Sequence, residues 1–179
     1  MISKPANFDQ INENGASRKL PMGGYVAIIH GVTDNEEKQF LEIEYDIAEG
    51  TYKGIALDAY ESWGSWNYTF RVYYTDKALW RFKKFITRVE ATNTGFVFDW
   101  GNPQCLVKRG IGLVIGIRHY WSKKDGSLKD ALDVQDFCTA TEVREGNLPS
   151  QPKEVDPKEP APAPAIAPAE DIDDGQLPF

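Results

Sequence analysis

The chain has 179 residues, of which 41% are hydrophobic, 12% aromatic and 26% charged, and its formal net charge is −7. This length suits one domain of about 100–150 residues, and the aromatic content excludes a wholly disordered chain. No stretch reaches the ~18 apolar residues that a membrane span requires, and the N-terminus lacks the apolar core of a signal peptide, so we expect a soluble intracellular protein.

The predicted elements begin after an N-terminal arm over residues 1–20, which has few apolar positions. Two strands are expected over 24–32 and 39–47, joined by a polar hairpin loop, and a third over 67–74. In the third strand, Arg71 and Tyr73 share the exposed face. The second strand alternates between two faces. The face expected to be buried consists of Leu41, Ile43, Tyr45 and Ile47, and the face expected to be exposed to solvent consists of Phe40, Glu42, Glu44 and Asp46.

The hydrophobic period then changes to that of a helix with Thr75 or Asp76 as its N-cap. One stripe of this helix consists of Leu79, Phe82, Ile86 and Val89. The opposite side carries Arg81, Lys84 and Arg88, which we interpret as a solvated face. A short strand is expected in the irregular stretch that follows, through Phe96, Phe98 and Trp100.

A long strand is predicted over 105–121, with Gly110, Gly112 and Gly116 on one face. Glycines that recur on one face of a strand indicate a bend or a close backbone approach. Asp125-Gly126 predicts a tight turn, and a return strand is expected over 131–143. Three strands, a helix and two strands follow the order of the five-stranded OB-fold barrel, which we predict over residues 21–147, with an unrelated α+β sandwich as the alternative.

The composition changes abruptly after the predicted barrel. Alternating proline and alanine over 160–168 can neither form a ladder of hydrogen bonds nor bury much surface. We therefore predict that residues 148–179 form a disordered Pro/Ala-rich linker that ends in an acidic tip.

Charge is distributed unevenly along the chain. Residues 53–124 carry a net charge of +7, although the whole chain is acidic, and they hold 15 of the 22 aromatic residues, including all five tryptophans. Cations interleaved with flat rings suit a ligand that has both phosphates and base faces, such as a nucleic acid strand. A core of rings under an ordinary solvated surface is the alternative, and composition does not separate the two.

Position in the predicted barrel selects the candidate binding residues. OB barrels bind nucleic acid across their second and third strands and the loops after the first and fourth. The second strand is acidic here, with Glu42 and Glu44, so we expect the path to cross the third strand and the 121–131 loop instead. Rings expected to stack on bases are Trp63 and Trp66, in a Gly/Ser loop over 61–67, with Tyr73, Tyr120 and Trp121. Cations expected to neutralise phosphates are Arg71, Arg118, Lys123 and Lys124, with Lys108 and Arg109 at the entrance of their strand.

Catalysis finds little support in the sequence. Neither a nucleophilic triad nor a Gly-rich phosphate loop is recognisable, so we expect no enzyme, no cofactor and no metal. Two cysteines, Cys105 and Cys138, are expected to be reduced thiols. A metal-dependent nuclease that uses Glu42 and Glu44 is a weaker alternative.

The chain ends in acidic residues and a hydrophobic Pro-Phe. Asp173 and Asp174 precede Leu177, Pro178 and Phe179, with Gly175-Gln176 between them. A terminal Phe can fill an apolar pocket while its carboxylate meets a cation, and the acids steer the tip toward a positive surface.

This tip resembles the C-terminal tip of bacterial single-stranded DNA-binding proteins, in which an acidic stretch ends in a hydrophobic residue, Pro and Phe. The order of domain, Pro-rich linker and tip is also similar. The barrel is more similar in layout to the single-stranded DNA-binding proteins of bacteriophages, around residues 49–54 and the hairpin over 118–134. These resemblances imply a protein that coats DNA strands in replication, recombination or repair, in the cytoplasm of a bacterial host, and recruits partner proteins through the tip.

The sequence therefore predicts a single-stranded DNA-binding protein that acts without sequence specificity. The alternative is an interaction module without DNA contact, which engages a host replication protein through its tail. The sequence does not decide between DNA and RNA, and it leaves a homo-oligomer open.

Overall fold

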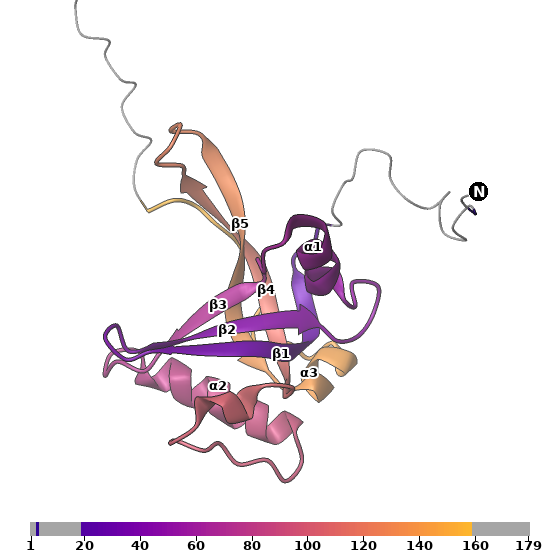
Figure 1. Cartoon of the computed structure of the whole chain (residues 1–179), viewed down its shortest axis with the longest axis vertical. Helices are drawn as coiled ribbons and strands as arrows, with labels where there is room; N and C mark the ends of the chain where they lie inside the picture. The colour runs from indigo at the N-terminus through magenta and orange to yellow at the C-terminus, as the bar shows by residue number, and fades with distance from the viewer. Residues whose placement is uncertain (1–2, 4–18, 159–179) are drawn as a thin grey trace, which may run out of the picture.

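The computed structural model describes Ser3 and residues 19–158, so most of the predicted arm, most of the linker and the whole tip lie outside the described residues. The described chain is mainly β, with a few helices (Figure 1). None of its helices is long and apolar enough to cross a membrane. In chain order the elements are β1 Gly23–Asn35, β2 Phe40–Ile47, α1 Ile55–Trp63, β3 Thr69–Tyr73, α2 Leu79–Thr92, the short 3-10 helix η2 Pro103–Leu106, β4 Gly110–Trp121, β5 Leu128–Cys138, α3 Ala140–Glu145 and β6 Glu154–Val155.

The strands form one open sheet in the order β3-β2-β1-β4-β5, and β6 adds to β4. The first five strands pair antiparallel, and β6 pairs parallel with β4. β1 is long enough to pair with β4 over Gly23–Ile28 and with β2 over Ala27–Asn35. No ladder joins β3 to β5 among the described residues, so the predicted closure into a five-stranded barrel is not seen.

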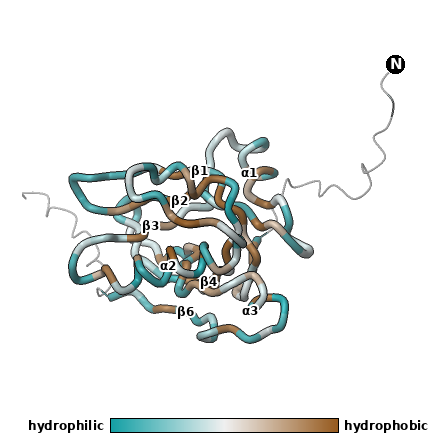
Figure 2. Tube along the Cα trace, turned by 90° about the horizontal axis from the view of Figure 1, so that it is seen from below, coloured by the Kyte–Doolittle hydropathy of each residue, from teal (hydrophilic) through white to brown (hydrophobic). Residues whose placement is uncertain are grey.

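The core lies where the curved sheet meets α2, and Figure 2 shows hydrophobic stretches gathered there while the turns are hydrophilic. Three rings connect the layers: the centroids of Phe70 and Phe137 lie 5.6 Å apart, and those of Phe85 and Phe137 lie 5.3 Å apart. The largest fully buried side chains include Tyr45, Phe85, Phe137, Ile29, Leu41, Ile43, Ile47, Leu106, Ile111, Leu113 and Ile115. Burial of this kind of side chain is the main driving force for folding.

The predicted alternation of β2 is confirmed for its apolar face and wrong at two positions of the other face. Phe40 and Asp46 are both buried rather than wet. Asp46 accepts hydrogen bonds from the backbone N–H groups of Ala56 (2.9 Å) and Leu57 (3.2 Å), at the N-terminus of α1. The carboxylate therefore caps a helix that the sequence analysis did not predict.

The predicted helix is present as α2, but its surroundings differ from the prediction. It begins after Ala78, without a side-chain cap, rather than after Thr75 or Asp76. Phe85 is fully buried, whereas Leu79 is 47% exposed. Arg81 and Lys84 do not form a solvated face, because α2 packs beside β5 and both side chains bond to that strand.

Other parts of the expected strand pattern also differ from the structure. No strand forms through residues 96–100, and Cys105 lies in η2, so β4 begins only at Gly110. The return strand stops at Cys138, because Thr139 and Glu142 form a reciprocal capping box that starts α3.

Residues 148–158, expected to be linker, continue along the sheet. The side-chain amide of Gln135 donates to the carbonyl of Lys153 (2.7 Å) and accepts from its N–H (3.0 Å), and β6 follows directly. A Cβ at position 116 would collide with the carbonyl of Lys153 and the amide of Gln135. The prediction that a glycine of β4 permits a close backbone approach is therefore confirmed at Gly116.

Candidate nucleic-acid interface

A cation and an aromatic ring lie side by side on the exposed face of β3, as predicted. The Nε of Arg71 donates to Glu42 of β2 at 2.8 Å, and the ion pair raises the pKa of the guanidinium. The guanidinium lies 4.7 Å from the ring centre of Phe40, and the ring of Tyr73 lies 5.2 Å from the same ring. Phe40 thus supports both side chains from below, while Tyr73 stays 41% exposed.

The two predicted loop tryptophans lie in different settings. Trp63 is the last residue of α1, not part of a loop, and is 66% exposed. The indole N–H of Trp66 donates to the carbonyls of Tyr45 (3.3 Å) and Tyr68 (3.2 Å). Its ring stacks on that of His30, with the ring centroids 3.9 Å apart and an angle of 7° between the ring planes. Trp66 is therefore a fixed ring that also holds β2 to β3, whereas Trp63 is open to a ligand.

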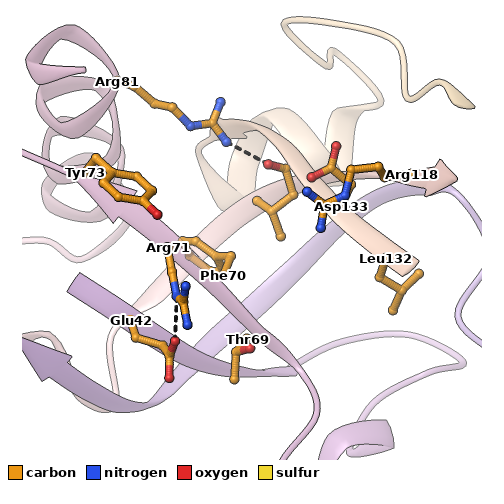
Figure 3. Close-up of a pocket in the computed structure, with 10 residues that line it drawn as sticks. Glu42, Thr69, Phe70, Arg71, Tyr73, Arg81, Arg118, Leu132 and Asp133 are labelled. Atoms are coloured by element: carbon orange, nitrogen blue, oxygen red, sulfur yellow. Dashed lines mark hydrogen bonds and ion pairs between the residues drawn. The ribbon is translucent and has the colours of Figure 1, made fainter. Parts of the chain in front are cut away.

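A cleft of about 400 Å³ separates the edges of β3 and β5 (Figure 3). Arg71 from β3, Arg81 from α2 and Arg118 from β4 all line it, and Figure 3 shows Arg118 beside Asp133. Arginines from three elements thus meet in one cleft with the exposed face of β3. Two carboxylates, Glu42 and Asp133, also line it.

Arg81 bonds to the backbone of β5 beside the cleft. Its guanidinium donates to the carbonyls of Val134 (2.6 Å) and Gln135 (2.8 Å) on β5 and lies 4.7 Å from the ring centre of Phe137. Burial lowers the pKa of this guanidinium, but an arginine stays charged at any physiological pH. A side chain, rather than β3, therefore satisfies this part of the β5 edge.

The hairpin of β4 and β5 carries the other predicted cations. A groove of about 460 Å³ lies between the C-terminal segment 155–158 and the hairpin residues Arg118, Tyr120, Trp121 and Lys123. Arg118 lines both this groove and the cleft, so the two surfaces adjoin at this residue. The predicted tight turn is present, with Gly126 at φ 65°, and Lys124 stands exposed just before it.

His119 connects three strands through its two ring nitrogens. Nδ1 lies 2.7 Å from Asp130 of β5, and Nε2 lies 3.4 Å from Glu154 of β6. The hydrogen bond to Asp130, and then that to Glu154, raise the pKa of His119 above its ordinary value. Protonation lets both nitrogens donate, so the imidazolium fastens β6 to the hairpin.

We expect the attachment of β6 to weaken as the pH rises. The pKa of His119 is raised in the folded chain. Protonated His119 therefore stabilises the attachment of β6 fully below the ordinary pKa of histidine, and this stabilisation is lost as the pH rises through the raised pKa. An NMR titration of His119, with the amide of Val155 followed in parallel, measures this. In the control Asp130→Asn, the pKa should return toward the ordinary value. A pKa of His119 at or below the ordinary value in the unmodified chain would contradict the arrangement.

Two predicted cations lie far from the cleft. Lys108 and Arg109 precede β4, where they bond to the backbone of Ile29, whereas Arg118 lies near the other end of the strand. The guanidinium of Arg109 lies 4.5 Å from the ring centre of Phe96. The structure therefore does not bring Lys108 and Arg109 together with the other candidates.

Sequence reasoning missed two contributors to this surface. Arg81 was assigned to solvent, and only the packing of α2 against β5 could have placed it in the cleft. Phe40 was also expected to be wet, although an aromatic residue within an acidic strand face is itself a signal for a supporting role. The tip residues Asp173, Asp174, Leu177, Pro178 and Phe179 lie outside the described residues.

Neither a protein-family model nor a curated protein matches this chain. Within residues 19–158, no group of three or more His, Cys, Asp or Glu side chains is placed to hold a metal ion.

Proposed function

We propose that this protein binds single-stranded DNA without sequence specificity, through a partly open barrel of the OB type. The strand order β3-β2-β1-β4-β5, with α2 between β3 and β4 along the chain, supports this assignment, because OB barrels are five-stranded and partly open. In this proposal, the DNA strand binds in the cleft between the edges of β3 and β5.

The observation that carries the proposal is a pair of adjoining surfaces that carry rings and cations. One is the cleft, with Tyr73 and Arg71 on β3, and the other is the hairpin groove; Arg118 lines both. The rings would stack on bases, at about 1–3 kcal/mol per base, and the cations would neutralise phosphates. Stacking requires base faces that a duplex hides, so the surface suits a single strand.

Glu42 does not oppose this path, because Arg71 neutralises it. Both side chains of the pair are substantially exposed, at 54% and 36%. The bond to Glu42 uses the Nε of Arg71, so the terminal N–H groups of the guanidinium can donate to a phosphate while Glu42 stays neutralised. The acidic face of β2 then lies beside the path rather than across it.

Tryptophan fluorescence during titration tests the proposal. The ligands are oligo-dT, a duplex of equal length and single-stranded RNA, each at two salt concentrations. We expect strong quenching by oligo-dT, weak quenching by the duplex and loss of binding at high salt, because phosphate contacts release counterions. Folded protein that responds to no nucleic acid would overturn the proposal and leave the interaction module as the better explanation. The RNA arm determines the preference between DNA and RNA.

The same proposal gives the C-terminal tip a role in recruiting replication or recombination proteins. The last described residues, 155–158, lie along the hairpin groove, so the described part of the chain ends beside the cations. We expect deletion of 159–179 to tighten oligo-dT binding at low salt, because an anionic competitor is removed. The titration above measures this, with neutralisation of Asp173 and Asp174 as the matched variant. Unchanged or weaker affinity in both variants would contradict the competition.

A further inference from the structure

A further pocket lies away from the proposed DNA path, between the tip of β1, the end of β3, the start of α2 and the loop before η2. Its volume is about 310 Å³. The pocket has an aromatic lining: the rings that face it belong to Tyr74, Phe82, Phe98 and Trp100. The proposed function uses none of these side chains.

The four rings form one cluster that lines the pocket, here called the aromatic box. Phe82 and Phe98 are buried, whereas Trp100 is 75% exposed and accessible to a ligand. The ring of Phe82 lies 5.7 Å from Tyr74 and 6.1 Å from Trp100, and Trp100 meets Phe98 edge-on at 5.2 Å. Ring faces carry negative charge density, so a pocket lined by rings attracts a cation.

One carboxylate stands at the edge of this box. The hydroxyl of Tyr74 donates to Oδ1 of Asp34 at 2.9 Å, which leaves Oδ2 of the same carboxylate to a ligand. Burial and this hydrogen bond raise the pKa of Tyr74 to about 12, so the phenol stays a neutral donor. Among the described residues that line the pocket, Asp34 supplies the charge, and it is negative.

The surroundings of the box are acidic as well. Glu36 lies close enough to Tyr74 to raise its pKa, and Asp99 precedes Trp100 in the chain. Phosphates would be repelled here, so this is not an extension of the nucleic-acid path. Leu79, which is 47% exposed, adds an apolar rim.

We propose that this pocket receives an arginine side chain, flanked by apolar residues, from a protein partner. The guanidinium stacks on Trp100 and donates to the carboxylate of Asp34, and the apolar neighbours of the arginine cover Leu79. A planar fork that both stacks on rings and pairs with a carboxylate is specific to arginine among the natural cations. The partner thus has the opposite charge character to the ligand of the β3 face.

The probe is the peptide acetyl-Ser-Leu-Arg-Leu-Ser-amide, and the control is the same peptide with citrulline, which keeps the shape and removes the charge. The indole N–H signal of Trp100 in a ¹H–¹⁵N spectrum of the full chain reports binding. We expect a saturable shift with the arginine peptide and at least about tenfold weaker binding of the citrulline peptide. Equal binding of both peptides, or no saturable shift at Trp100, would overturn the proposal.

Two exposed positions supply the variants. Trp100→Ala removes a ring of the aromatic box, and Asp34→Asn removes the charge while it keeps an acceptor for Tyr74, so each should lower peptide affinity by about tenfold or more. Both variants should bind oligo-dT as the unmodified chain does. Loss of oligo-dT affinity on Trp100→Ala would assign the box to the nucleic-acid path and overturn the inference. Because the peptide assay contains no nucleic acid, its failure is distinct from failure of the proposed function.

Discussion

Replacing Arg71 and Arg118 together by glutamine is expected to lower the affinity for oligo-dT by about 100-fold at low salt. The two arginines face one cleft from β3 and β4, so both contact the same strand of nucleic acid in the proposed complex. Each lost phosphate contact on a single strand should also lower the slope of log K against log salt by about 0.7. Fluorescence titrations at four or more salt concentrations measure both quantities.

The matched control removes the same charge elsewhere. Lys108 and Arg109 lie before the start of β4, remote from the cleft, so Lys108→Gln with Arg109→Gln should change the affinity less than about threefold. If the control lowers the affinity and the salt slope as much as the cleft variant does, binding depends on overall charge rather than on this cleft, and the proposed path is wrong.

Phe137→Ala should destabilise the fold by about 3–5 kcal/mol. The ring is fully buried, contacts Phe70 and Phe85, and lies under the guanidinium of Arg81. Its removal leaves a cavity at the junction of β5, β3 and α2, with little room for the sheet to collapse into it. The free energy of unfolding of a folded domain is only about 5–15 kcal/mol. The loss should therefore be obvious in urea unfolding, as a lower midpoint concentration at an unchanged dependence of the free energy on urea.

Val97→Ala is the control for that measurement. Val97 is 76% exposed, and substitutions at such surface positions usually change stability by within about 0.5 kcal/mol. A loss of less than about 1 kcal/mol for Phe137→Ala would show that the ring does not support the core as its burial indicates.

The sequence predicted the elements whose own pattern determines them. The apolar face of β2, the alternation in β3 and the stripe of α2 are set by residues two, three or four positions apart, so local periodicity reveals them. β4 and β5 were found for the same reason, although their limits were not. The Asp125-Gly126 turn follows from backbone chemistry alone.

The elements that were not predicted depend on residues far away in the chain or are only a few residues long. The side chain that caps α1 is Asp46, on the preceding strand, whereas the N-cap residue Gly54 has no side chain to bond the first turn. β6 is two residues long, within a segment whose composition suggests a linker. α3 had a readable signal, the Thr139–Glu142 capping box with Gly146 as its C-cap, but the apolar alternation before it extended the predicted strand too far.

Strand alternation placed some of the candidate side chains on one exposed surface, whereas the positions of others depend on contacts between strands. Arg71, Tyr73 and Arg118 line one cleft, because strand alternation reports which side chains face outward. Trp66 was predicted to be a reachable loop ring, but it bonds to two carbonyls and stacks on His30. Contacts of that kind arise only when three strands come together, and no spacing along the chain encodes them.

The short pairing of β6 with β4 has a consequence for how the chain tolerates shortening. β1 pairs with β4 only as far as Ile115, so the same side of β4 at Ile117 and Arg118 is covered by Glu154 and Val155. An uncovered strand edge is a template on which a second chain can add a strand. A chain cut at residue 147 would lose this cover and leave the hairpin with an open margin, so we expect it to self-associate as its concentration rises. Residues 148–158 are thus expected to help keep the protein from self-associating.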